Sequence, residues 1–383
     1  MAKQLKLRSL QLWFFPKRSR KRFTKEFTKG FTLVELLVAL FIGGVIVTLL
    51  LFTVVQLLQT NQREAARSDT QREMQMALDY ISRDLREAVY VYDANCLATP
   101  TNFNPATLNT CPGLLPYLPA DIATNAENLP VLAFWRVDAL PQPLLDRCEN
   151  NANAFSSTDR NAVLPPAIQG VPCISSQMYT LVVYSLNWRA EEEWRGKARI
   201  RRYQIPQFVY NPPGSPPDTT LGWYYPAGQD TDFSRWPLKK TLGLDGNPVN
   251  LQLPPSGRGA PVVNLTTPNQ VLVDFVDKDG VKFAADTACP RPNNITDPPP
   301  APGPSVVDSN LNTRYTITPA VTPNIPRGFY VCVKGAANNG TLNQEVVVRI
   351  QGNAAGRPGI GRDASLPIPM ETRVLTRGVV NKI

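Results

Sequence analysis

The sequence predicts an α+β protein in which one long N-terminal helix packs on an antiparallel, β-rich globular head. Three observations support this fold class. An uncharged apolar run covers residues 36–55, a helical pattern without Pro or Gly continues to residue 90, and apolar segments separated by turn residues follow. The length permits one large domain or two small ones, and 43% hydrophobic residues are enough to form a core.

The net charge is concentrated at the N-terminus. The chain carries 40 Lys+Arg against 31 Asp+Glu, a formal charge of +9. Residues 1–30 hold ten of the basic residues and one acidic residue, Glu26, so the other 353 residues are balanced at 30 of each sign. A basic surface is typical of nucleic-acid binders, but this excess lies in a leader segment. We therefore expect no nucleic-acid partner.

The chain contains no histidine. This excludes Ser and Cys triads with a His base, His-ligated zinc or haem, and imidazole pH switches. No phosphate-binding loop, nucleotide fingerprint or Ser-x-x-Lys pair occurs in the sequence. We therefore expect a non-catalytic protein with no metal and no cofactor.

All six cysteines lie beyond residue 95. An even number confined to one part of the chain is typical of an oxidising compartment and of up to three disulfides. Proximity along the chain favours the pairs 96 with 111, 148 with 173, and 289 with 332. Many other connectivities are open, and buried free thiols are the alternative. The residues are Cys96, Cys111, Cys148, Cys173, Cys289 and Cys332.

The apolar run at residues 36–55 has the length of a transmembrane helix. Its 20 residues carry no charge, and such a helix spans about 30 Å at ~1.5 Å per residue. The cations before it place the N-terminus in the cytoplasm and the rest of the chain outside it, by the positive-inside rule. A secretory signal peptide is the competing interpretation, but the run is too long and no cleavage site follows it.

Glu35 introduces a carboxylate at the start of this apolar helix. Ionisable groups in a membrane segment are costly and suggest a function, whereas a favourable interaction with the helix dipole is the simpler explanation. The surrounding residues resemble the prepilin-type cleavage and methylation motif of type IV pilins and type II secretion pseudopilins. The basic leader, glycine, phenylalanine, glutamate and apolar helix stand in the register of that motif. The resemblance is carried by residues 29–39, KGFTLVELLVA.

The resemblance implies processing. A prepilin peptidase would cut between Gly30 and Phe31 on the cytoplasmic face and methylate the new N-terminal Phe31. Glycine suits the close approach of a peptidase because it has no side chain. We expect the Glu35 carboxylate to pair with the new amine of Phe31, either in a neighbouring subunit or in the same chain.

These features divide the chain into four parts. They are a basic cytoplasmic leader removed by the peptidase (1–30), a transmembrane and assembly helix (31–58), its amphipathic continuation (59–90) and a periplasmic head (91–383). The continuation carries an apolar stripe at helical spacing. The stripe comprises Met74, Leu78, Ile81, Leu85 and Ala88.

Finer resemblances concern the subtype. The end of the helix resembles minor pseudopilins of the J type and pilins of the W type. Phe52 stands near the position where many major pilins carry a proline, which favours a minor subunit. Residues 83–92 and 130–137 and the proline-rich head are similar to pseudopilins of hormogonium polysaccharide secretion, linked to gliding motility.

The head should contain short antiparallel strands. A proline-rich segment at 290–304 predicts an exposed loop, because Pro suits neither a helix nor a central strand. The expected strands are 131–137, the hairpin 179–188 with 197–205, and the pairs 271–275 with 281–284 and 329–334 with 345–350.

Three groups of charged residues stand out in the head. Asp274, Asp277 and Asp279 suggest calcium, which major pseudopilins bind, but an Asp-Gly turn explains them and the bidentate Glu is missing. Residues 191–193, three glutamates, predict a solvated turn. A charged sheet face is expected from Lys197, Arg199, Arg201 and Arg202.

Taken together, the residues and the resemblance predict a minor pilin or pseudopilin subunit. It would assemble through its N-terminal helix at the initiation point or tip of a type II secretion-like pseudopilus or type IV pilus, supporting export of polymer or protein and gliding or twitching motility. Its expected partners are the prepilin peptidase, other subunits, membrane lipid and, indirectly, an inner-membrane platform protein and assembly ATPase. The alternatives are a DNA-uptake minor pilin and a single-pass anchored periplasmic receptor or enzyme.

Overall fold

The computed structural model describes residues 30–98, 111–119, 122, 127–155, 164–209, 218–219, 223–252, 270–280, 289, 315–319, 328–334, 344–362, 364 and 366–377. The leader, the expected strand at 281–284 and the proline-rich segment at 290–304 lie outside the described residues. The chain divides into two compact units, Met1–Leu58 and Gln59–Ile383.

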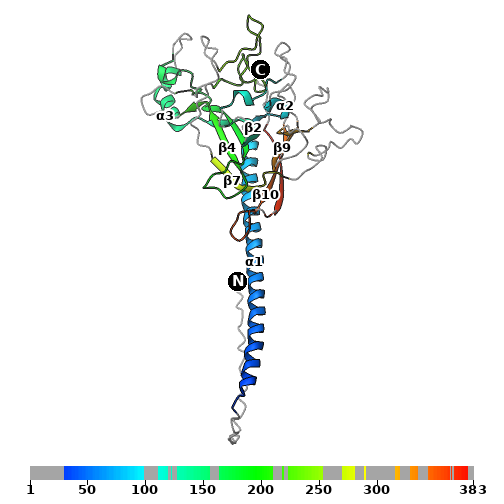
Figure 1. Cartoon of the computed structure of the whole chain (residues 1–383). Helices are drawn as coiled ribbons and strands as arrows, with labels where there is room; N and C mark the ends of the chain where they lie inside the picture. Colours follow the sequence, from blue (N-terminus) through cyan, green and yellow to red (C-terminus); the bar gives the residue numbers. More distant parts are fainter. Residues whose placement is uncertain are drawn as a thin grey trace, which may run out of the picture. The chain divides into compact units, whose positions relative to one another are not determined.

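Helix α1 extends over Leu33–Arg86 (Figure 1). Its sequence contains no proline, so its backbone hydrogen bonds are not interrupted. The prediction of a helix to residue 90 is wrong in its last part, because Ala88–Val91 form strand β1. The β-branched and aromatic side chains of this segment favour a strand, and β1 pairs with β2.

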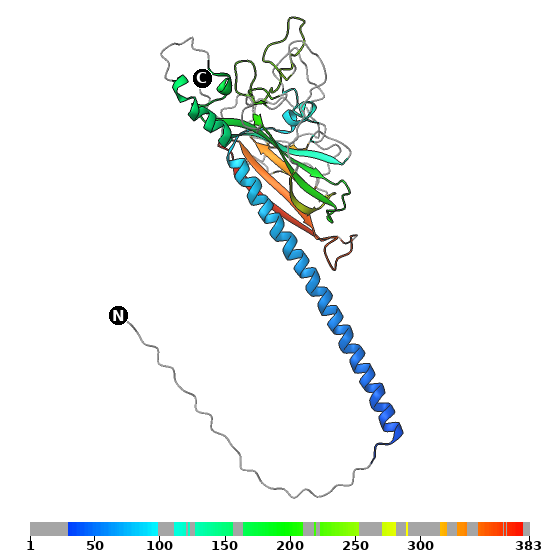
Figure 2. The same cartoon turned by 90° about the vertical axis from the view of Figure 1, so that its left-hand side faces the viewer.

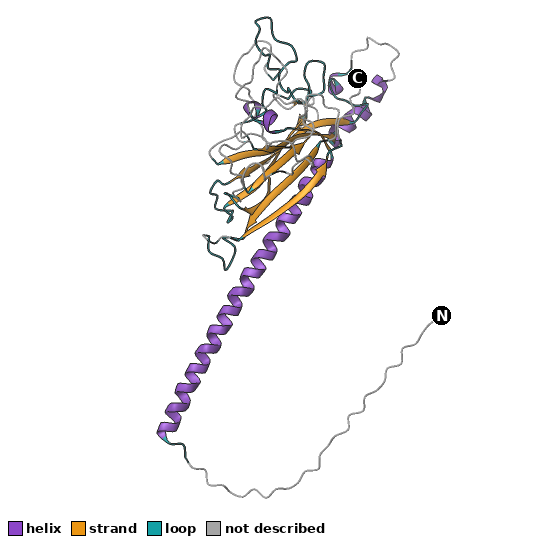
Figure 3. Ribbon diagram, turned by 90° about the vertical axis from the view of Figure 1, so that its right-hand side faces the viewer, coloured by secondary structure: helices purple, strands orange, loops and turns teal. Residues whose placement is uncertain are grey.

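A nine-stranded antiparallel sheet forms most of the second unit, and Figures 2 and 3 show its strands side by side over the C-terminal part of α1. The strand order is β1-β2-β3-β4-β7-β10-β9-β8, with β11 pairing to β10. After β1, the strands are β2 Asn128–Ala139, β3 Gln177–Asn187, β4 Ala198–Pro206, β7 Gln270–Val276, β8 Tyr315–Thr318, β9 Phe329–Lys334, β10 Glu345–Asn353 and β11 Pro367–Leu375.

Short elements complete the described part of the second unit. A two-stranded sheet pairs β5 with β6. The short strands are β5 Phe208–Val209 and β6 Asp218–Thr219, the short helices are α2 Ala94–Leu97 and α3 Gln142–Asn150, and the 3-10 turns are Leu115–Tyr117, Ala152–Phe155 and Pro166–Ile168.

The predicted hairpins are confirmed where the structure describes both strands. Strand β3 pairs with β4, and β9 pairs with β10. Strand β7 forms as expected and pairs with β4 and, at one position, with β10. Strands β8 and β11 were not predicted from the sequence. Pro367 and Pro369 made β11 hard to predict, because proline has no backbone N–H to donate to a neighbouring strand.

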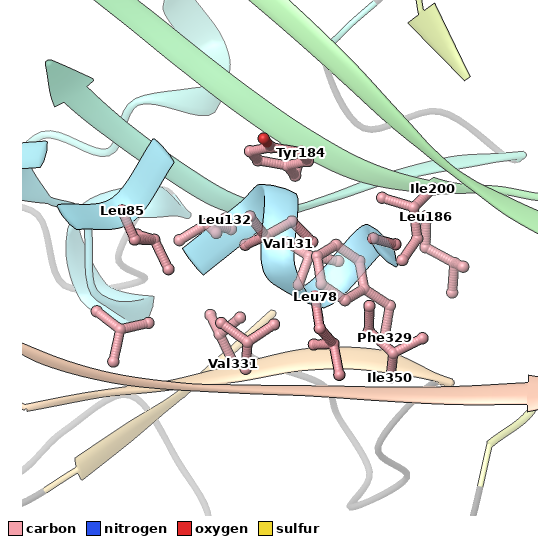
Figure 4. Packing of buried hydrophobic residues seen from close by; sticks show 14 of the residues in the cluster. Leu78, Leu85, Val131, Leu132, Tyr184, Leu186, Ile200, Phe329, Val331 and Ile350 are labelled. Carbon is pink, nitrogen blue, oxygen red and sulfur yellow. The ribbon is translucent and has the colours of Figure 1, made fainter. Parts of the chain in front are cut away.

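The sheet curls around α1 so that the helix lies inside it. Figure 4 shows Leu78 and Leu85 between Tyr184 on one side and Val331 and Ile350 on the other. The buried cluster takes residues from α1 and from every strand of the large sheet except β8. The α+β fold class predicted from the sequence is confirmed, because a long helix packs on an antiparallel curled sheet.

A buried side chain closes the curl. The Gln344 side-chain amide donates from Nε2 to the carbonyl oxygen of Val91 and accepts from its N–H, each at 2.7 Å. Gln344 directly precedes β10, and Val91 ends β1 at the edge of the sheet. The Gln344 side chain therefore hydrogen-bonds to Val91 as a paired strand residue would, and it joins two segments far apart in the chain.

The outer face of the sheet carries a second cluster, rich in aromatic residues. Alternate residues of β2 and β3 point to it, as the period of a strand requires. Trp135 lies edge-on to Trp236, with ring centroids 5.1 Å apart, and donates a 2.9 Å hydrogen bond to Tyr92 Oη. The cysteines are joined as Cys96–Cys111, Cys148–Cys173 and Cys289–Cys332.

Candidate processing and assembly site

The backbone at the expected cleavage point is accessible. Gly30 and Phe31 precede α1, and 81% of Phe31 is exposed. A Cβ built on Gly30 would meet no atom within 4 Å. The fold of the described residues therefore does not require glycine here, and the requirement would come from an enzyme that approaches the backbone.

Thr32 caps the start of α1. Its hydroxyl oxygen accepts the Glu35 N–H at 3.3 Å and lies 3.5 Å from Glu35 Oε2, to which it can donate. This is the Thr-x-x-Glu pattern of a helix N-terminus, where a carboxylate is also favoured by the helix dipole. The pattern was present in the sequence, but the prediction considered only the amine of Phe31 as a partner for Glu35.

The helix beyond Glu35 presents apolar side chains all around. Every residue at positions 36–55 is exposed. Among the described residues, α1 alone is long and apolar enough to cross a membrane, with a mean hydropathy of 2.8 over its most apolar window and none of that window buried. Thr48 and Thr53 turn their hydroxyls back to carbonyl oxygens of Val45 and Leu49, at 2.8 and 2.9 Å. Their polar groups are thus satisfied within the helix, as hydrocarbon surroundings require.

Gly43 and Gly44 lie within this apolar part of α1. A Cβ on either residue would meet no atom within 4 Å. No described residue of the same chain therefore uses the space that these glycines leave. They provide a place where a neighbouring helix can approach the backbone closely.

Further along α1, Asp84 anchors the helix inside the sheet. Its carboxylate accepts hydrogen bonds from Arg202 Nε at 2.8 Å, Tyr184 Oη at 2.6 Å and Arg136 at 2.7 Å. Burial, and then the Asp84 charge, raise the pKa of Tyr184 far above its ordinary value. Sequence reasoning missed this cluster, because its members come from α1 and from three separate strands.

Two of the four residues expected to form a charged sheet face, Arg199 and Arg202, are buried in β4. Arg199 is 1% exposed and Arg202 is 6% exposed. Arg199 lies 3.3 Å from Glu191, and Arg201 lies 2.5 Å from the same carboxylate. Glu191 is therefore an ion-pair partner, whereas Glu192 and Glu193 lie in an exposed turn as expected. Burial lowers the pKa of Arg199, and its acidic neighbours oppose that shift.

The three aspartates that suggested a calcium site make other contacts. Asp274 accepts the N–H groups of Arg195 and Gly196, at 3.2 and 2.9 Å. Asp277 accepts from Gln351 Nε2 at 2.8 Å and, together with Asp279, forms an Asx turn. Among the described residues, no group of three His, Cys, Asp or Glu side chains is placed to hold a metal ion.

Comparison with known proteins bears on the N-terminal segment. Residues 28–51 match the family model described as the prokaryotic N-terminal methylation motif. The match covers Gly30, Phe31, Glu35 and the two glycines of α1. No curated protein and no solved structure matches the chain.

Proposed function

We propose that this chain, a type IV pilin-like protein with an N-terminal methylation motif, is a non-catalytic minor pilin or pseudopilin subunit. One observation carries the proposal. The methylation motif stands at the start of a helix whose first half is largely apolar and exposed, with an accessible backbone at Gly30 and Phe31. The motif implies cleavage by a prepilin peptidase, anchoring in the inner membrane before assembly, and assembly with pilins.

The proposed orientation places the leader, residues 1–30, in the cytoplasm and the head in the periplasm. The basic leader supports this orientation by the positive-inside rule. The three disulfides of the second unit support it independently, because disulfides persist in oxidising compartments. The working parts are then a transmembrane and assembly helix, residues 31–58, a continuation at 59–90 and a head at 91–383.

Glu35 is the proposed assembly residue. A carboxylate at the edge of an apolar helix bundle is costly unless it meets a positive charge. Cleavage after Gly30 creates such a charge at the amine of Phe31, in the same chain or in a neighbour. Thr32 already orients the carboxylate at the helix start, which supports a defined pairing geometry.

The proposed subtype is a minor subunit at the initiation point or tip of the filament. Support comes from α1, which runs through Phe52 without a proline, and from the size of the head. Within this proposal the subunit supports export of a polymer or protein and gliding or twitching motility, as hormogonium polysaccharide secretion pseudopilins do. A platform protein and an assembly ATPase of the inner membrane would supply the force.

Processing is the direct test. The protein is produced in cells with an active prepilin peptidase, extracted from membranes and analysed by mass spectrometry of its N-terminal peptide. We expect an N-methylated peptide that begins at Phe31, and an unprocessed chain both in peptidase-deficient cells and for Gly30→Val. A chain that keeps Met1 in the peptidase-positive cells contradicts the proposal and favours a permanently anchored receptor or enzyme.

A further inference from the structure

Strand β11 forms an open edge of the large sheet. It pairs with β10 along its whole length, and among the described residues no strand lies on its other side. Its side chains alternate: Ile368 and Val374 are buried, whereas every second residue from Pro367 to Leu375 is exposed. An open edge of this kind is a template on which another chain can add a strand, which leads to aggregation or strand exchange.

The other two ends of the sheet offer less to a further strand. Strands β1 and β8 have four residues each, against nine in β11. Gln344 already bonds both backbone groups of Val91 in β1. In β8, Thr318 Oγ1 donates to the carbonyl oxygen of Val131 at 2.7 Å. Strand β11 is therefore the longest open edge in the part of the sheet that the structure describes.

The backbone groups of β11 point alternately to β10 and to the open edge, as in any strand. Thr376, directly after β11, donates its N–H to the carbonyl oxygen of Gln344 at 2.9 Å, so the even-numbered positions face β10. Gln351 of β10 stands opposite Pro369 and turns its N–H the other way, to the carbonyl oxygen of Gly328 at 2.6 Å. The odd-numbered positions of β11 therefore present their backbone groups to the open edge.

Both prolines of β11 stand at positions that face the open edge. Pro367 is opposite Asn353, and Pro369 is opposite Gln351. The missing N–H costs no bond to β10 here, and the proline ring projects to the side where a further strand would lie. A pairing strand has to approach to about 4.8 Å, and the ring occupies that space. The two prolines thus obstruct the first half of the edge without weakening the sheet.

The second half of the edge carries charged side chains. Glu371 and Arg373 face the open edge and are 44% and 56% exposed at their side chains. Glu371 pairs with Arg349 at 2.7 Å, and Arg373 pairs with Glu345 at 3.1 Å, both on β10. Charged side chains are a common means of discouraging a further strand at an edge. Because these charges already have partners, an incoming strand gains little from them.

We propose that Pro367 and Pro369 protect the sheet against strand pairing with a second copy of this chain. Contacts between copies are then left to α1 and to side chains of the second unit. Such protection matters most where many copies lie close together, as in a filament. That last point rests on the proposed function, whereas the protection of the edge does not.

The test restores the missing N–H groups. The double variant Pro367→Thr/Pro369→Thr of the unprocessed full-length chain is purified in detergent beside the wild type. Size-exclusion chromatography with light scattering then measures the mass of protein per particle over a range of concentrations. We expect the variant to reach at least about two-fold the wild-type mass, because two edges can now pair. Pro358→Thr is the matched control, since Pro358 is exposed in the loop between β10 and β11, and it should behave as the wild type does.

Two further substitutions show whether the edge itself is responsible. Glu371→Pro, added to the double variant, obstructs the edge again and should restore the wild-type mass. Made singly, Glu371→Pro removes no bond to β10, whereas Thr372→Pro removes the bond to Val348, its partner in the register. Thr372→Pro should therefore lower the urea midpoint of the wild-type chain more than Glu371→Pro does.

The proposal is overturned if the folded double variant keeps the wild-type mass at every concentration, or if Glu371→Pro does not reverse the association. Circular dichroism verifies folding. If the double variant is unfolded, the single variants Pro367→Thr and Pro369→Thr decide by the same measurement. Since no cleavage is involved, this inference and the proposed pilin function can fail separately.

Discussion

The carboxylate of Asp84 on α1 lies 2.8 Å from Nε of Arg202 on β4, and 118 positions separate the two residues in the chain. Each is 6% exposed. A buried carboxylate shared by two arginines and a tyrosine fixes both the rotation and the height of the helix inside the curled sheet. Apolar packing alone would allow the helix to rotate or slide more readily, because the hydrophobic effect is not directional.

Asp84→Ala should destabilise the second unit strongly. The substitution leaves Arg136 and Arg202 without their common partner, and breaking a buried ion pair costs roughly 3–5 kcal/mol. Urea denaturation of the full chain, followed by near-UV circular dichroism, measures the loss. Asp79→Ala is the control, since Asp79 is exposed on the same helix, and an equal effect of both substitutions would refute the anchoring role.

Stability should fall as the pH rises above 10. Burial, followed by the neighbouring Tyr225, raises the pKa of Tyr179 from 10.0 to about 12. Below pH 10 the phenol is neutral in both states and the stability is fully present. Between pH 10 and about 12 the unfolded chain loses a proton that the folded chain retains, so unfolding becomes easier.

Denaturation at several alkaline pH values measures this slope. Tyr179→Phe should reduce the slope, whereas Tyr80→Phe, which removes an exposed phenol, should change it less. Equal slopes in the wild type and in Tyr179→Phe would show that the phenol is not protected in the folded state.

Glu35→Gln should separate processing from assembly. The cleavage point at Gly30 and Phe31 remains unchanged and exposed, so we expect the peptide to be cut. The neutral side chain cannot pair with the amine of Phe31, so the fraction of the protein that sediments with filaments should fall several-fold. Glu64→Gln, at an exposed position further along α1, should assemble normally. Normal assembly of Glu35→Gln would remove the need for the ion pair.

The Cys289–Cys332 disulfide should contribute most among the three. It closes the longest loop, with a sequence separation of 43 against 15 for Cys96–Cys111. Loop-closure entropy predicts losses of roughly 4 and roughly 3 kcal/mol for the two double alanine variants. Urea midpoints of both variants, compared with the wild type, test the order. The reverse order would mean that native contacts, and not loop length, determine how much each disulfide contributes to stability.

Local sequence patterns were sufficient for most of the regular structure. Spacing of three and four residues identified the buried stripe of α1, and apolar segments that flank turn residues identified β3, β4, β9 and β10. The predicted stripe nevertheless included one member too many, because α1 ends at Arg86. Ala88 continues the helical spacing and is buried, but it lies in β1. Burial at a matching interval cannot distinguish the last turn of a helix from the first residue of a strand.

The charges of β4 show a limit of pattern reading. Alternation correctly places Arg199 and Arg201 on one face of the strand, but it cannot tell whether another element covers that face. The loop that carries Glu191 and Trp194 does so. The Asp84 cluster was invisible for the same reason, because its partners are brought together only by the curl of the sheet.

At the N-terminus the prediction needed no tertiary contact. Gly30, Phe31 and Glu35 were identified by their spacing and by the apolar run behind them, and the family match covers the same segment. The capping role of Thr32 was not predicted, although the sequence alone could have shown it, since a helix cap depends on residues within one turn.

The last strand completes the core that the first helix begins. Val374 of β11 lies in the same buried cluster as Met74 of α1. At ~5–20 residues per second, synthesis of the intervening chain takes on the order of tens of seconds. During that interval the apolar side of the helix has no finished sheet to cover it. The species at risk of aggregation is therefore the growing chain and not the completed protein.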